Sequence, residues 1–357
     1  MERDVTYEYN DNFIIYYRLD IIMEKLKSVL KSNPIDWLLE KDNPSVRYFA
    51  LTELLDKSLS DIEVKKAKGA IMKIGTVPKI FSKQNDKGYW MGPEKFYSSK
   101  YKGAVWQLII LAELGADEKD ERVKQACEFI LEYSQDHASG GFSVWNSKKN
   151  GGGRHSGVIP CLTGNMVWSL IRLGYFGDSR VDRGIEWINK FQRFDDGIST
   201  RPKGWPYDKA TSCFGKHSCH MGVIKSLKAL AEIPSDKRSK KTKSSVNKAV
   251  EYLLIHNIFK RSHNLSRVSK PGWLRFGFPL MYQDDVLEIL GILTTLGCKD
   301  ERMQEAIDLV ISKQNDRGQW NLESTFNGRF LTNIESKGKP SKWITLNAVK
   351  MLKRYYA

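Results

Sequence analysis

The stretch AVWQLIILAELG, residues 104–115, decides the fold, because it is apolar almost all round. A helix with apolar residues on every side has to be buried, and its closing glycine is a common helix C-cap. A charged turn then leads to residues 121–135, where apolar residues recur at i, i+3, i+4 and i+7, as on one face of an amphipathic helix. The stretch therefore predicts a buried helix followed by a helix that covers it.

The same order of features recurs along the chain, which is typical of a repeat architecture. The buried helices are expected at 45–55, 104–115, 161–174, from 212, at 285–297 and at 340–354. Helix pairs of this kind stack because neither helix covers its apolar face alone. We expect an all-α fold, an α/α toroid of about six inner and outer helix pairs, because nearly all-apolar inner helices and a lone final helix favour a closed ring. Residues 35–357 form this one domain, and residues 1–34 are an N-terminal appendage and lead-in helix.

Charge and cysteine content limit the partners and the compartment. The net charge is +15 and the pI is near 9.4, but the basic residues are spread over the predicted helices and match no nucleic-acid motif, so no nucleic-acid partner is expected. The run at 237–243 is predicted to be a solvated loop. Five unevenly spaced cysteines, no signal peptide and no transmembrane segment predict a cytoplasmic protein.

Soft metal ligands gather in one octet, with Cys213, His217, Cys219 and His220 in eight positions and Cys161 at the start of an earlier buried helix. Thiolate and imidazole are the usual ligands of zinc. A helix running from residue 212 would place positions 213, 217 and 220 on one face. The pattern favours a zinc ion at a catalytic site; the alternative is that these cysteines pack in the core, as isolated cysteines do.

Two further groups are candidates for chemistry at the start of the inner helices. Asp284 and Asp285 open the helix at 285–297, where they could donate a proton or simply cap the helix. Cations that could bind an anionic part of a substrate, or merely lie on the surface, are Arg154, His155, Arg261, His263 and Arg275. In a ring of parallel inner helices, these scattered residues would meet at one rim of a central cavity.

The repeat closings at Gln84–Trp90 and Gln314–Trp320 resemble the QW motifs of triterpene cyclases. Residues 35–357 look like the α/α-toroid superfamily of terpenoid cyclases and protein prenyltransferases, in which the glutamine and tryptophan tie successive outer helices together. The Asp284–Asp285 pair resembles the acidic motif that protonates the substrate in class II terpene cyclases. It lacks that motif's further acidic residue and its threonine–alanine.

Cys161 with His217–Ser218–Cys219 is similar to the zinc site of protein prenyltransferase β subunits. That family has an aspartate two residues before the cysteine, where this chain has Ile159. Lanthionine cyclases are similar in another way, since their zinc is held by a cysteine and a later adjacent Cys-His pair, which Cys161 and Cys219–His220 could imitate. The resemblances agree on Cys161 and leave the other ligands open.

These observations favour an enzyme of the prenyltransferase or cyclase type, with a zinc site at the cavity rim. Its substrate would be an isoprenoid or other lipophilic molecule, and zinc could activate a thiol substrate for transfer. One alternative is metal-free, acid-initiated cyclisation with Asp285 as proton donor. Another is a helical-repeat binding module with structural zinc. Whether a partner subunit is needed stays open.

Overall fold

The computed structural model describes residues 26 and 28–357, and the part of the predicted appendage at 1–25 and 27 lies outside the described residues. The described chain is mostly helical, with one two-stranded sheet. The helices are α2 (Ile35–Leu38), α3 (Pro44–Phe49), α4 (Ile62–Ile71), α5 (Thr76–Phe81), α6 (Ala104–Glu113), α7 (Glu121–Tyr133), α8 (Pro160–Leu170), α9 (Ser179–Phe191), α10 (His220–Glu232), α11 (Lys240–Leu254), α12 (Val286–Thr295), α13 (Gln304–Ser312) and α14 (Lys342–Tyr356), and the strands are β1 (Lys260–Arg261) and β2 (Asn264–Val268).

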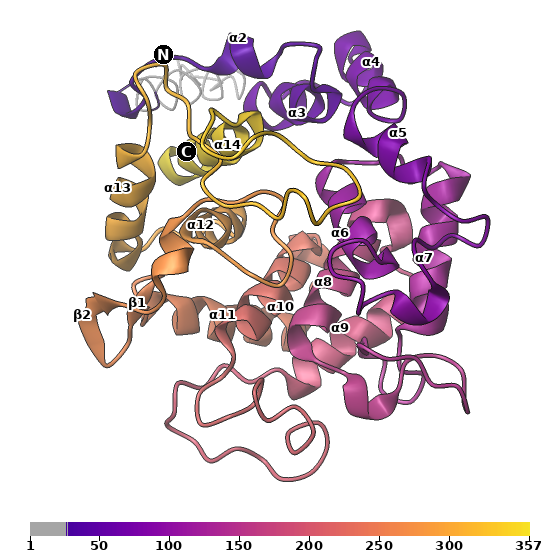
Figure 1. Cartoon of the computed structure of the whole chain (residues 1–357). Coiled ribbons are helices and arrows are strands. Elements are labelled where there is room, and N and C mark those ends of the chain that lie inside the picture. The colour runs from indigo at the N-terminus through magenta and orange to yellow at the C-terminus, as the bar shows by residue number, and fades with distance from the viewer. Residues whose placement is uncertain (1–25, 27) are drawn as a thin grey trace, which may run out of the picture.

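The buried helices lie side by side toward the middle of the molecule (Figure 1), and the amphipathic helices lie outside them. Along the inner set, α6 contacts α8, α8 contacts α10, α10 contacts α12, α12 contacts α14, and α14 contacts α3. The expectation of a mostly helical fold is confirmed, and the inner helices other than α10 begin within two residues of the predicted positions. The closed toroid of six pairs stays a prediction.

Helices α8 and α10 approach each other closely because a glycine lies between them. A Cβ atom on Gly164 would sit 2.4 Å from the carbonyl carbon of Lys225, well inside van der Waals contact. The close approach brings the start of α8 to the start of α10, and with it Cys161 to Cys219. Two segments that the sequence separates by more than fifty residues therefore share one end of the inner layer.

A glutamine at the end of three of the outer helices bonds the segment that follows it around the fold. The amide of Gln84 donates to the carbonyl of Arg122 at 2.9 Å, and the amide of Gln135 donates to the carbonyl of Arg180 at 2.6 Å. Gln314 makes the corresponding bond to the carbonyl of Val29 at 3.0 Å, so the last closing contacts the lead-in segment. Gln192 departs from this pattern and bonds Ser226 at 3.2 Å.

A second set of interactions, an aspartate cap bound by an arginine, recurs at the start of three outer-helix segments. Asp120, Asp178 and Asp300 cap α7, α9 and the turn before α13 by accepting a backbone N–H two residues on. The arginine at that position binds the capping aspartate, and in two copies it also binds a glutamate of the preceding outer helix: Arg180 to Glu128 at 2.6 Å and Arg302 to Glu251 at 2.8 Å. The charged turns noticed in the sequence thus link neighbouring repeats.

Two sequence expectations are wrong at the level of local structure. Residues 213–218 form a loop, and α10 begins only at His220, because Ser218 and His217 pair with Asp195 and Asp196. The basic run at 237–243 is not a loop throughout, since α11 begins at Lys240 with Ser239 as its cap. None of the described helices is long and apolar enough to cross a membrane.

Replacing Gln135 by methionine should destabilise the fold, because Gln135 is buried and donates to the carbonyls of both Gly140 and Arg180. Methionine fills a similar volume but leaves the buried carbonyl of Gly140 without its donor and removes the bond to Arg180, which costs about 1–3 kcal/mol. Urea unfolding measures the loss. The exposed Gln304, whose amide donates to Asp308 at 2.8 Å and accepts a long bond from Tyr355 at 3.4 Å, provides the control Gln304→Met, which should change stability little. Equal effects of the two substitutions would contradict a structural role for Gln135.

Candidate functional site

The two aspartates at the start of α12 occupy different environments. Asp285 caps the helix, as one of the two interpretations predicted: one carboxylate oxygen accepts the N–H of Glu288 at 2.9 Å and the other accepts the N–H of Gly277 at 2.8 Å. Asp284 is also buried, at 4% exposed, but neither of its oxygens has a hydrogen-bond partner among the described residues. Asp285 is therefore held in place by the backbone, whereas the carboxyl group of Asp284 has no such bonds.

Burial raises the pKa of both aspartates. The loss of hydration raises the pKa of Asp284 to about 8 and that of Asp285 to about 7. Two N–H donors favour the carboxylate form of Asp285, and Asp284 lacks such donors, so Asp284 is the group that keeps its proton to higher pH. At neutral pH the start of α12 thus presents a neutral carboxylic acid.

Asp284 lines a cavity of about 400 Å³ between the start of α10, the loop at 270–284 and the loop at 324–326. This volume lies within the range of small-molecule sites. The wall carries aromatic and apolar side chains together with a few polar ones, namely Met221, Trp273, Pro279, Leu280, Phe326, Lys270, Arg275, Gln283, Ser324 and Thr325. An apolar cavity with one neutral acid suits a lipophilic ligand.

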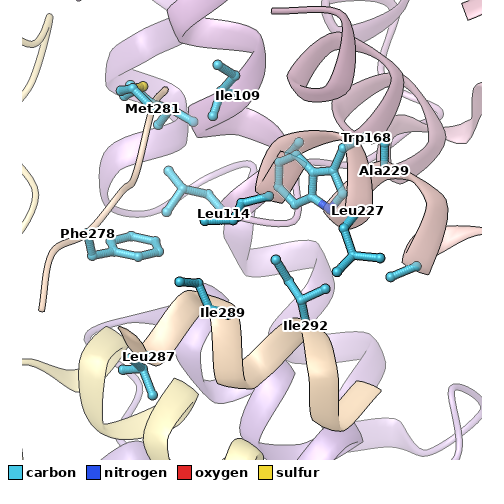
Figure 2. Packing of buried hydrophobic residues seen from close by; sticks show 14 of the residues in the cluster. Ile109, Leu114, Trp168, Leu227, Ala229, Phe278, Met281, Leu287, Ile289 and Ile292 are labelled. Carbon is cyan, nitrogen blue, oxygen red and sulfur yellow. The ribbon is translucent and has the colours of Figure 1, made fainter. Parts of the chain in front are cut away.

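A second, smaller cavity of about 170 Å³ adjoins the first, since Gly277 and Leu280 line both. Asp285 and Glu288 face this second space, along with Trp168 of α8. Figure 2 shows buried apolar side chains of different inner helices packed together, among them Trp168 and Ile292, which line this second cavity. The aspartate pair therefore marks the border between a rim cavity and the interior of the helix layer.

The other buried carboxylates near the second cavity are paired with lysines. The ammonium of Lys225, which is fully buried, lies 2.6 Å from Glu288, and that of Lys228 lies 3.0 Å from Glu288 and 2.5 Å from Glu113. Burial alone would raise the pKa of Glu288, but Lys225 and Lys228 hold it below its usual value. Glu288 is therefore ionised at neutral pH, whereas the nearby Asp284 is neutral.

Three of the candidate zinc ligands converge, and two lie elsewhere. Cys213 and Cys219 lie close enough for each to shift the pKa of the other, and Cys161 is close enough to raise the pKa of Cys213. The Cys213 thiol lowers the pKa of Cys219 to about 6. His217 instead faces Asp196 at 3.3 Å, and the ring of His220 stacks on Trp273 at 4.0 Å.

The five candidate ligands therefore do not form one ligand set. Over residues 26 and 28–357, no group of three or more Cys, His, Asp or Glu side chains is arranged to hold a metal ion. A shared helical face for positions 213, 217 and 220 is excluded by the loop that precedes α10. The residues present thus do not fit a zinc ion in this arrangement.

Of the five cations predicted to bind an anion, Arg275 lines the cavity of Asp284. His155 bonds Asp136 at 2.7 Å and stacks on Trp205, while Arg154 packs over Trp145. Arg261 and His263 lie at the exposed β1–β2 turn.

Sequence reasoning missed the pairing of Lys225 and Lys228 with buried glutamates, and it missed Phe326, which reaches the cavity from a distant loop. Two lysines inside the otherwise apolar stretch 223–231 were the signal for the ion pairs. Nothing in the sequence around Phe326 distinguishes it from a core aromatic residue.

No family model and no curated protein matches the chain. Among solved structures, matches include variants of the type II terpene cyclase MstE from Scytonema. Two of them, in complex with the substrate geranylgeranyl dihydroxybenzoate, have 13% identity and TM-scores of 0.40 and 0.42, and cover 96% of this chain and 99% of the other. A third, with the product merosterolic acid A, has 12% identity and a TM-score of 0.28, and covers 82% and 96%. At these identities and at TM-scores below 0.5, the matches carry no argument about the family, substrate or reaction of this chain.

The stability of the protein should depend on the proton of Asp284. Because its folded pKa is raised, the folded state keeps a proton that the unfolded state releases between about pH 4 and pH 8, so the free energy of unfolding falls as pH rises through that window. Asp284→Asn carries no such proton and should escape this loss. Urea unfolding at about pH 5 and about pH 8 should show the variant gaining more than about 1.4 kcal/mol over wild type, the equivalent of one pKa unit. A pH-independent difference would contradict the raised pKa.

Proposed function

We propose that this chain is an acid-initiated isoprenoid cyclase in which Asp284 is the proton donor. The observation that carries the proposal is a buried, unpartnered carboxyl group with a pKa raised to about 8, on a residue that lines a largely apolar cavity of about 400 Å³. A general acid needs to be protonated at the working pH and to lie within reach of its substrate. Asp284 meets the first condition and lines the space where a substrate would bind.

The chemistry requires little else from the protein. Asp284 would add its proton to one carbon of an alkene, leaving a carbocation on the other carbon, and a second alkene of the same molecule would attack that cation and close a ring. Loss of a proton ends the sequence. Trp273 and Phe326 offer aromatic faces, which attract cations through their ring quadrupoles.

Asp285 then has a positioning role in place of the donor role predicted from the sequence. Its two backbone bonds, to Gly277 and Glu288, fix the loop at 277–285 against the start of α12 and so hold the neighbouring Asp284 in the cavity wall. Arg275 and Lys270 line the same cavity and would bind an anionic part of the substrate if it has one.

We infer further that residues 35–357 form one domain, a closed α/α toroid of six helix pairs, and that the closings at Gln84 and Gln314 act as QW motifs. Contacts of α14 with both α12 and α3 support a closed inner ring. The bond from Gln314 to Val29 supports a closed outer ring, since it joins the last closing to the lead-in segment.

A substitution of Asp284 tests the cyclase directly. Wild type and Asp284→Asn are incubated in D₂O with squalene, isoprenoid alcohols and diphosphates, and geranylgeranyl dihydroxybenzoate, and cyclic isomers are detected by mass spectrometry. We expect wild type to form a cyclic product that carries deuterium at the protonated carbon. Asp284→Asn should lose ~100- to 10,000-fold in rate, which is the usual contribution of a general acid.

The matched control is Asp120→Asn, which alters a capping aspartate on an outer helix and should leave turnover unchanged. Turnover by Asp284→Asn within tenfold of wild type would exclude Asp284 as the donor.

A zinc-activated thiol transferase, the interpretation that the sequence favoured, is the rival candidate to be tested, although the described Cys and His side chains form no metal-ligand set. It predicts about one zinc per chain in protein purified without chelator, measured by elemental analysis. Cys161→Ser should then reduce the metal content, whereas Cys127→Ser, in the buried face of α7, should not. Metal-free protein would exclude this candidate.

A further inference from the structure

The loop before α10 places two cysteines opposite each other. Phe214 and Ser218 form an antiparallel bridge, and the N–H of Cys219 donates to the carbonyl of Cys213 at 3.1 Å. Cys213 and Cys219 are therefore the next facing pair, and facing residues of this hydrogen-bonded kind have Cα atoms about 5.5 Å apart. That spacing lies within the range that a disulfide spans.

The two thiols are also close together and within reach of solvent. The Cys213 side chain is near enough to lower the pKa of the Cys219 thiol, so both side chains lie on the same side of the loop. Both residues are half-buried and free, whereas Cys127 is buried in the packing face of α7. A small molecule can therefore approach this pair but not Cys127.

We propose that Cys213 and Cys219 are a redox-active dithiol that a small-molecule disulfide converts into an intramolecular disulfide. The pair lies beside the cavity, because the next residues, His220 and Met221, contact Trp273 and line the cavity respectively. Closing the disulfide ties the loop at 213–219 to the start of α10. This inference does not depend on the proposed cyclase activity.

The exchange balances in two steps. The Cys219 thiolate attacks one sulfur of the small disulfide, forming a mixed disulfide and releasing one thiolate. Cys213, after losing its proton, attacks the Cys219 sulfur and releases the second thiolate. The protein gives up two electrons, the small disulfide is reduced to two thiols, and the two protons of the cysteines end on those thiols.

Oxidised glutathione is the probe for the test. The full chain is equilibrated with mixtures of oxidised and reduced glutathione, quenched with acid and denatured, and its thiols are counted. We expect the count to fall from five to three per chain, because five free cysteines are present and one disulfide removes two. Cys298→Ser, which removes another half-buried cysteine, should still lose two thiols.

Trypsin locates the bond, since Lys216 lies between the two cysteines. A Cys213–Cys219 disulfide joins peptides 210–216 and 217–225, whereas a bond to Cys161 would join one of them to peptide 155–172. Cys213→Ser should lose the joined peptides and keep one glutathione on Cys219, and a melting curve like that of wild type would show that it folds. Five surviving thiols, a bond to Cys161, or a stable glutathione adduct on the wild type would each overturn the proposal.

Discussion

The outer helices depend on one repeated hydrogen bond, from a glutamine amide to the carbonyl of a residue in the next repeat. Gln135 makes it while 1% exposed, so losing it would leave a buried carbonyl unpaired. The glycines that follow these glutamines also lie against the neighbouring segment. A Cβ on Gly318 would lie 2.0 Å from the carbonyl oxygen of Ser32, and the φ of Gly318, +67°, suits glycine. Because each closing is fixed to its neighbour, successive inner helices enter the core from the same side.

Because the inner helices begin on the same side of the core, the site is assembled from distant parts of the chain. The amide of Asn165, in the first turns of α8, donates to the carbonyl of Met281 at 3.0 Å, three residues before Asp284. Tyr101, just before α6, contacts the amide of Gln283 and the ring of Phe326. Four segments between residues 101 and 326 therefore meet around one carboxyl group. Function here follows from topology rather than from any local motif.

The sequence predicts the helices well because their apolar periodicity depends only on which face is buried. It predicts the loop at 195–219 poorly, since the helical spacing of Cys213, His217 and His220 is overridden by pairing with Asp195 and Asp196, a contact between segments about twenty residues apart. The Asp284–Asp285 pair was recognisable as a helix start with possible chemistry. The sequence does not show which of the two aspartates is the cap. The choice depends on the N–H of Gly277, which reaches Asp285 only in the folded loop.

The balance of charges between buried lysines and glutamates explains why the carboxyl group of Asp284 keeps its proton. Lys225 and Lys228 are each bonded to Glu288, and Lys228 also to Glu113, so two ammonium groups face two carboxylates and their charges cancel. Lys225 still lowers the pKa of Asp284, but burial raises it more, and no direct hydrogen bond compensates. A buried carboxyl without donors or a counter-ion of its own stays neutral, because ionising it would require charge in a region that water does not hydrate. The Lys225–Glu288 pair is therefore as necessary to the acid as its cavity, since removing the Glu288 carboxylate would leave Lys225, which already lowers the pKa of Asp284, without that partner.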